Sequence, residues 1–403
     1  MKFAVNAVSS GARVGSLVLG ELQLETPCLL LLTRKGLPAF ITPDLLDALH
    51  PDASALQISP VHFVDNPSPS TVAAIGGAHK ILSQPKRAIV AIARDSLGHE
   101  TDGENSTKFG ASFETPNGRR LVTPKIYMEA MNALKPNLWA ALPDEVPAWA
   151  TAKRNRVSVD RTLLWLDECL SLHAAIDDNI LGVIVGGSTI DERKRSAQST
   201  ALRNVSGYSL GGFGLGENPE DRGSLLEAAI TNLPADKIRH VSGLGMPEEV
   251  LHAVSHGVDL FDSTYPHMLT MGGFAMTFPF CMEEKNGYTR SDTSYEERAD
   301  AGADSAKINL FSVTHRNDVS PIVKGCKCYA CRKHTRAYIH HLLNVHEMLA
   351  QTLLDIHNYH HYLNFFQAIR EAVAKDKFEK FRHWFISQRR EIVLADSLKA
   401  NKI

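Results

Sequence analysis

Three cysteines stand within six residues, in the segment Cys326-Lys-Cys-Tyr-Ala-Cys331. Thiolates in a C-x-C-x2-C arrangement bind Zn²⁺ well, because one tight turn supplies three of the four ligands of a tetrahedral site. Unligated thiols this dense would be open to oxidation. The cluster therefore predicts a zinc site whose fourth ligand lies elsewhere in the chain.

Several histidines follow these cysteines, and spacing alone does not choose among them. Those at 334, 340 and 341 fall on the helix expected to leave the turn, and would point along it or away from it. A histidine on a second helix that folds back is better placed. On that basis the candidates for the fourth ligand are His346, His357, His360 and His361.

The elements that must position any site alternate from about residue 88 onward. Short apolar runs read as strands, and amphipathic segments between them read as helices. The segments expected to contain strands are 87–95, 137–144, 180–187, 205–217, 238–245 and 258–266. The expected helices are 123–134, 158–176, 189–204, 218–233 and 246–257. Repeated strand, loop and helix predict an α/β fold with a parallel sheet covered by helices.

A doubly wound sheet and a closed (β/α)8 barrel both satisfy this alternation. The length and the Gly-rich or acidic loop after each strand favour a (β/α)8 barrel, which carries functional groups at the carboxyl ends of its strands. The residues at those ends form one set of site candidates: Asp95, Asp144, Gly186, Gly187, Gly211, Gly212, Gly243, Gly245 and Asp262.

Composition narrows the class of protein. The 403 residues are 44% hydrophobic and 22% charged, as in a soluble globular chain. A formal net charge of -2 gives no global basic field, so a nucleic-acid contact would be local or supplied by a partner. No transmembrane run and no secretory signal are seen, so we expect a cytoplasmic protein with reduced thiols. Cys28, Cys169 and Cys281 stand alone in apolar surroundings and are expected to be buried.

Two segments interrupt the alternation. Residues 282–306 are polar and without periodicity, which predicts a long surface loop. From Phe366 onward the chain predicts one or two basic amphipathic helices. Packing against the body or a partner subunit is their expected role, ahead of a membrane or RNA contact.

The segment CKCYACRKHTRAYIHHLL, together with LLDIHN, resembles the zinc segment of the tRNA-guanine transglycosylase (queuine tRNA-ribosyltransferase) family. That resemblance selects His357 as the fourth ligand of a structural zinc ion held by Cys326, Cys328 and Cys331. Residues 14–46 and several later segments match family motifs in order. The implied fold is a (β/α)8 barrel at 1–320, with the loop insertion at 282–306, followed by a zinc-binding and helical subdomain at 321–403.

Members of this family exchange the wobble guanine of certain tRNAs for queuine or a precursor. By resemblance, Asp262 occupies the position of the aspartate nucleophile and Asp95 that of a second aspartate that handles protons. Gly211 and Gly212 preserve the glycine platform that holds the base.

Other family positions have changed. A base-reading glutamine is Val185, and the base-reading aspartate falls at Pro143, with Asp144 one position off. Two phosphate-binding arginines are Met268 and Met271. The glycine pair and Phe-Gln that follow the second aspartate are also missing. These losses together argue against catalysis by the chain alone.

The pattern resembles the eukaryotic accessory subunit, the non-catalytic partner in the heterodimeric enzymes of the family. It implies no catalytic residues, with Asp262 and Asp95 as remnants. The implied partners are the catalytic subunit and, through the complex, tRNAs with G-U-N anticodons. The implied location is the cytoplasm. Peripheral association with the mitochondrial outer membrane also occurs in the family.

Two alternatives stay open from the sequence. A self-sufficient transglycosylase would use Asp262 as nucleophile and need basic residues elsewhere. A barrel that only carries a modified base would bind the base without acting on tRNA. The basic candidates for the first alternative are Lys375, Lys377, Lys380 and Arg382.

Overall fold

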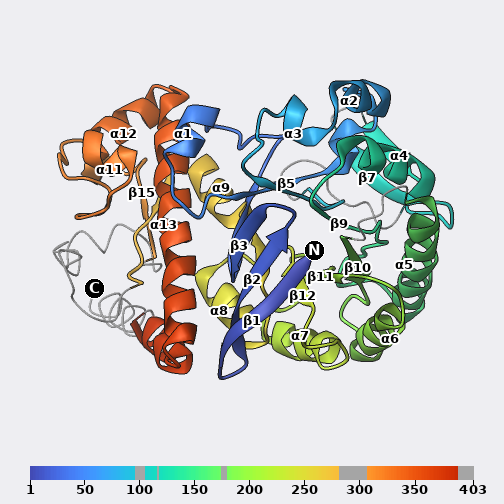
Figure 1. Ribbon diagram of the computed structural model, residues 1–403. Helices are drawn as coiled ribbons and strands as arrows, with labels where there is room; N and C mark the ends of the chain where they lie inside the picture. Colours follow the sequence, from blue (N-terminus) through green and yellow to red (C-terminus); the bar gives the residue numbers. More distant parts are fainter. Residues whose placement is uncertain (96–104, 116–117, 174–178, 281–305, 389–403) are drawn as a thin grey trace. The chain divides into compact units, whose positions relative to one another are not determined.

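The computed structural model describes residues 1–95, 105–115, 118–173, 179–280 and 306–388 (Figure 1). The chain forms two compact units. The barrel unit comprises Met1–Ala39 and Ser54–Thr264, and the second unit comprises Phe40–Ala53 and Tyr265–Ile403. The division into domains at 1–320 and 321–403 stays a prediction. The loop expected at 282–306 lies outside the described residues except for Ala306, as does Cys281.

Eight parallel strands of the barrel unit close on themselves in the order β10-β11-β12-β13-β4-β5-β6-β9. Their bounds are β4 (Cys28–Leu32), β5 (Ala55–Ile58), β6 (Ala88–Ala91), β9 (Leu138–Ala140), β10 (Ile180–Ile184), β11 (Gly207–Leu210), β12 (Ile238–Val241) and β13 (Leu260–Asp262). Every residue of these strands is buried, as expected for parallel strands covered on both faces. The predicted (β/α)8 barrel is confirmed.

Helices follow most of these strands and surround the barrel (Figure 1). In α4, the Thr123 side chain accepts a hydrogen bond from the Ile126 N–H and Pro124 opens the first turn, as the Thr-Pro pair predicts. The barrel unit contains η1 (Pro60–Phe63), α2 (Pro69–Ile75), α3 (Ala78–Ile81), α4 (Pro124–Leu134), α5 (Ala152–Leu172), α6 (Ile190–Ala201), η2 (Pro219–Asp221), α7 (Arg222–Ile230) and α8 (Pro247–Ser255).

Two small antiparallel sheets complete the barrel unit. The first, with strands β1 (Lys2–Ser9), β2 (Ala12–Leu19) and β3 (Leu22–Thr26), precedes the first barrel strand. The second pairs β7 (Ala111–Thr115) with β8 (Gly118–Val122).

The second unit is largely helical. Its elements are α1 (Pro43–Asp47), β14 (Phe274–Met276), β15 (Lys307–Asn309), η3 (Val313–His315), α11 (Tyr329–Lys333), α12 (Arg336–Asn344) and α13 (Leu349–Ala374), and α9 (Thr264–Met271) begins at the end of the barrel unit. Helical backbone resumes at residue 378 and continues to 388. Phe278, Phe365 and Phe385 pack together between these helices, with ring centroids 5.2–5.6 Å apart. Among the described residues, no helix is both long and apolar enough to span a bilayer.

Candidate metal centre and barrel mouth

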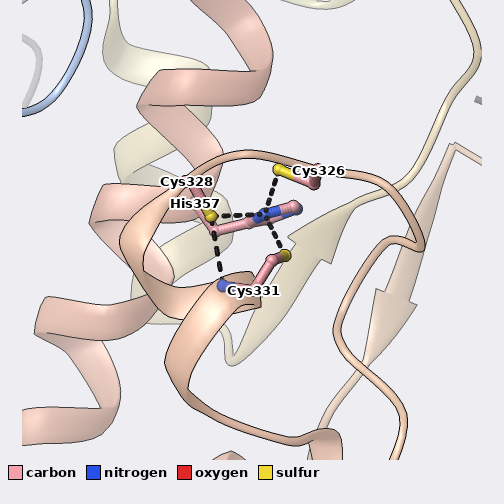
Figure 2. A group of neighbouring side chains, drawn as sticks. All are labelled: Cys326, Cys328, Cys331 and His357. Atoms are coloured by element: carbon pink, nitrogen blue, oxygen red, sulfur yellow. Dashed lines mark hydrogen bonds between the residues drawn. The ribbon is translucent and has the colours of Figure 1, made fainter. Parts of the chain in front are cut away.

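The three clustered cysteines converge on one histidine of α13 (Figure 2). The Nδ1 atom of His357 lies 3.9, 3.6 and 3.4 Å from the Sγ atoms of Cys326, Cys328 and Cys331. All four donor atoms lie within 4.8 Å of one another. The turn is held locally, because the Cys331 N–H donates to the Cys328 Sγ at the start of α11.

These distances fit a tetrahedral zinc ion. Zn–S and Zn–N bonds of about 2.3 and 2.0 Å at tetrahedral angles place sulfur and nitrogen about 3.6 Å apart, which lies inside the range found around His357. Hydrogen bonds with the Cys328 and Cys331 thiols hold the pKa of Cys326 far below its usual range. The donor set therefore favours a thiolate, the form that binds metal.

The backbone fixes which nitrogen His357 offers to the cluster. Its Nε2 lies 2.8 Å from the carbonyl oxygen of Met276 and donates to it, which leaves Nδ1 free to accept a metal. Two of the other histidine candidates turn elsewhere. His360 donates to the Leu49 carbonyl, and His361 donates to the Phe278 carbonyl.

At the mouth of the barrel, Asp262 ends β13 and lies almost wholly buried, with 1% exposure. Its Oδ2 accepts from the Gly243 N–H at 2.9 Å, and its Oδ1 accepts from the Thr264 N–H at 3.0 Å. Both carboxylate oxygens therefore satisfy backbone donors, one of them at the first turn of α9. The geometry is that of a structural cap.

Asp95 is equally enclosed. Its Oδ2 lies 2.8 Å from the Nε2 of His62, and both side chains are 1% exposed. The backbone N–H of Lys35 donates to the other ring nitrogen of His62, so Nε2 carries the proton and donates to Asp95. The residues that follow Asp95, 96–104, lie outside the described part of the chain.

Asp144 is paired away from the barrel axis. Arg154 donates to both of its oxygens at 2.7 and 2.8 Å, and Arg161 donates to Oδ2 at 3.2 Å. The neighbouring residues Pro143 and Glu145, rather than Asp144, line the cavity at the mouth. Asp144 therefore supplies no free carboxylate for reading a base.

A buried guanidinium donates hydrogen bonds to the carbonyl groups of the glycine platform. Arg193, fully buried on α6, donates to the carbonyl oxygens of Gly187, Gly211 and Gly212 at 2.7, 3.1 and 3.2 Å. The same guanidinium lies 4.2 Å from the ring centre of Phe213. Burial lowers the pKa of Arg193 to about 10, so it stays charged at neutral pH.

The remaining platform donor is also taken. The Gly212 N–H donates to the Glu145 Oε1 at 2.6 Å, and Arg94 donates to the Phe213 carbonyl at 2.6 Å. Glu145 sits so close to Gly211 that an added Cβ there would meet Oε1 at 2.8 Å. Arg94, Glu145 and Arg193 carry no sequence signal of this role, because nothing in a sequence shows which way a side chain faces inside a barrel.

Little room remains among these groups. The cavity that Arg94, Pro143, Glu145, Ser209 and Ser242 line has a free volume of about 10 Å³. That is close to the least that holds one water molecule, and far below the hundreds of Å³ of ordinary ligand pockets.

The two methionines at the former arginine positions are exposed on α9. Met268 is 62% and Met271 57% accessible to solvent. Of the basic residues considered for an alternative RNA contact, Lys375 pairs with Glu371, and Arg382 pairs with Glu379.

Comparison with known proteins places these features in a family. The family model described as queuine tRNA-ribosyltransferase matches residues 8–391. A relative from Xenopus tropicalis is 36% identical over 401 residues, covering 93% of this chain and 96% of that protein. Relatives from Homo sapiens and Danio rerio are 34% and 33% identical, covering 95% and 96% of this chain and 98% and 99% of those proteins. All three carry the name queuine tRNA-ribosyltransferase accessory subunit 2. This chain belongs to the queuine tRNA-ribosyltransferase family.

Proposed function

We propose that the chain is the non-catalytic accessory subunit of a heterodimeric queuine tRNA-ribosyltransferase. In that role it supports exchange of the wobble guanine for queuine in tRNAs for Asp, Asn, His and Tyr, whose anticodons are G-U-N. The names of its relatives support the accessory role. The observation that carries the proposal is the state of Asp262, whose two oxygens both accept backbone N–H groups.

A carboxylate nucleophile must reach the ribose of its substrate. Asp262 is 1% exposed, and the cavity lined by Glu145 and Gly211 has a free volume of about 10 Å³, which is far too small for a purine. The platform glycines are engaged by Arg193 and Glu145. Asp262 and Asp95 are therefore remnants in this proposal. Gly211 and Gly212 maintain the conformation of their loop and do not bind a base.

The Cys326, Cys328, Cys331 and His357 group holds one structural Zn²⁺ in this proposal. Four protein ligands complete a tetrahedral site and leave no position for a reacting water. The support is the match between the N···S distances and zinc geometry. Binding of the ion would supply folding free energy to the turn at the start of α11 and tie it to α13.

The second unit offers a surface for the catalytic subunit. Several apolar side chains of this unit are exposed to solvent. They are Met268, Met271, Phe311, Val313, Val345, Met348 and Leu349. We assign the subunit contact to this surface, with the zinc turn stabilising the helices behind it. The complex is expected in the cytoplasm, and the mitochondrial outer membrane could be reached by peripheral attachment.

Asp262→Asn tests the proposal directly. In the complex with the catalytic subunit, the variant is expected to incorporate queuine into tRNA at the unchanged rate. The free energy of unfolding falls by about 1–3 kcal/mol, because an amide cannot replace both acceptor oxygens. The matched control is the same substitution at the nucleophile of the catalytic subunit, which abolishes exchange. Loss of exchange on Asp262→Asn, in a complex that still assembles, would contradict the proposal that Asp262 is a remnant.

A further inference from the structure

One tryptophan at the carboxyl end of the barrel is displayed to solvent. Trp149 lies between β9 and α5 and is 72% exposed, whereas Trp139 and Trp165 are 3% and 1% exposed. Tryptophan is enriched at contact surfaces, because its ring combines a large apolar face with a polar N–H. No sequence motif assigns this residue a role.

The ring is held by the neighbouring loop. Gly216 has a left-handed backbone (φ +93), and a Cβ added there would meet the indole at 2.7 Å, so the ring packs against bare backbone. The Ala148 N–H donates to the Leu215 carbonyl at 3.0 Å. The Glu217 carboxylate accepts from the Leu215 N–H at 2.9 Å and fixes that loop in turn. One edge of the indole is thus seated on the protein while the rest stays open.

Two cations follow Trp149 in the chain, four and seven residues on. Lys153 and Arg156 lie exposed in the first turns of α5, and neither has an ion pair in the described part of the chain. Positive charge at a helix N-terminus opposes the helix dipole and costs stability. Arg154 differs, because it is bound to Asp144. A cationic first turn with two unpaired members is therefore available to an anion.

The nearby carboxylates determine on which side of Trp149 unpaired positive charge remains. Asp160 on α5 and Glu192 on α6 are both paired with Arg195, so they do not cancel the two free cations. The loop on the other side continues into η2, where Glu220 and Asp221 are exposed. A chain of phosphates would thus leave the indole toward α5 and away from η2.

We propose that Trp149, Lys153 and Arg156 form a contact for single-stranded RNA, with one unpaired base stacked on the indole and the flanking phosphates at the two cations. Aromatic rings flanked by cations bind single strands without sequence preference. Such a local contact suits a chain of net charge -2, which lacks a general basic field. The inference deepens the proposed function and rests on it, because the RNA would be the tRNA handled by the complex.

The test is steady-state exchange by the complex of this chain with its catalytic subunit, using unmodified tRNA. Stacking of one base contributes about 1–3 kcal/mol, so Trp149→Ala is expected to raise KM for tRNA about 5- to 100-fold at unchanged kcat. Trp149→Phe keeps a π face and retains most of the affinity. Trp149→Leu is apolar without a π face and behaves as alanine. An unchanged KM in Trp149→Ala overturns the proposal, and so does weakened subunit pairing, which would mark a protein contact.

Salt dependence tests the cations separately. On a single strand each lost phosphate contact lowers the slope of log affinity against log salt by about 0.7, so Lys153→Glu with Arg156→Glu is expected to reduce it by about 1.4. Lys86→Glu is the matched control, because Lys86 is exposed before β6, at the opposite end of the barrel. An equal change in the control, or none in the double variant, contradicts the assignment.

A failure of the proposed function can be told apart from a failure of this contact. If the mixed subunits show no exchange, the isolated chain is titrated with oligouridylate while tryptophan fluorescence is followed. Quenching in the wild type that is absent from Trp149→Phe supports the RNA contact on its own. Equal quenching in both proteins, or none in either, overturns it.

Discussion

The Asp262 carboxylate shows how neighbours decide what a residue can do. It keeps the side chain of a nucleophile, yet its oxygens accept from the Gly243 and Thr264 N–H groups. Asp95 is likewise bound to His62. The sequence retains both aspartates, and only the geometry shows that each already has a partner. Residue type alone therefore does not show how these two carboxylates are engaged.

His240 gives a pH-dependence at the scale of one residue. It is fully buried on β12, with Nδ1 2.9 Å from the Ser209 Oγ and no partner at Nε2 in the described residues. Burial lowers its pKa to about 4 although the nearby Asp262 charge opposes the shift. The unfolded chain, with an ordinary histidine pKa of about 6.5, therefore binds the proton more strongly between these two values.

Stability conferred by neutral His240 is therefore present above about pH 6.5 and is lost as the pH falls toward 4. Between pH 7 and pH 5 the loss is about 2 kcal/mol. The free energy of unfolding is measured with denaturant at both pH values, for the wild type and for His240→Gln. The variant should lack the loss that is due to His240, and the contributions of other groups should cancel in the difference between the two proteins. Equal losses in both proteins would show that His240 does not titrate as described.

At the scale of elements, the cysteine turn leads into short α11 and faces His357 of long α13. α11 has five residues and buries Ala330, so it has little core of its own. Short segments of this kind usually depend on their metal for folding. The ion would thus hold the exposed apolar surface of the second unit in one shape.

Removal of the metal should loosen this turn. A zinc chelator, or Cys328→Ser, is expected to abolish co-purification with the catalytic subunit, because the turn behind the contact surface is released. Chelation should also add three thiols to those that react with a disulfide reagent, from Cys326, Cys328 and Cys331. Cys169→Ala is the control, since that thiol is buried alone in α5 with its pKa raised to about 12 by burial. Intact pairing of the Cys328→Ser chain would sink the assignment of the contact surface.

The elements also show what the sequence can predict. Strands such as β10 are apolar throughout and were expected, as was α4 with its Thr-Pro start. β5 was not expected, because four residues that include Gln57 carry little periodicity. α5 begins at Ala152 rather than at 158, because Thr151 caps a first turn of basic residues that looks like a loop.

The site, too, could be predicted from the sequence only in part. The resemblance selected His357, and the structure brings it to the three cysteines. Spacing alone could not, because His360 and His361 lie on the same helix and differ only in the direction they face. Glu145 and Trp149 were missed for a similar reason. The burial of one and the exposure of the other follow from the closure of the barrel rather than from local sequence.

At the scale of the whole molecule, three features matter: a closely filled barrel mouth and two exposed surfaces. Among the described residues, the cavity at the mouth has a free volume of about 10 Å³, the second unit displays apolar side chains, and the barrel unit displays Trp149 with two cations. A net charge of -2 leaves the binding of RNA to local contacts and to the partner. These features are expected of a subunit that assists catalysis performed elsewhere.

Incorporation of labelled queuine into unmodified tRNA tests this account most directly. The purified chain is assayed alone and after mixing with the catalytic subunit, at equal total protein. We expect no incorporation by the chain alone and sustained incorporation by the mixture, above that of the catalytic subunit alone. Incorporation by the chain alone would contradict the account, and would make Asp262 a working nucleophile.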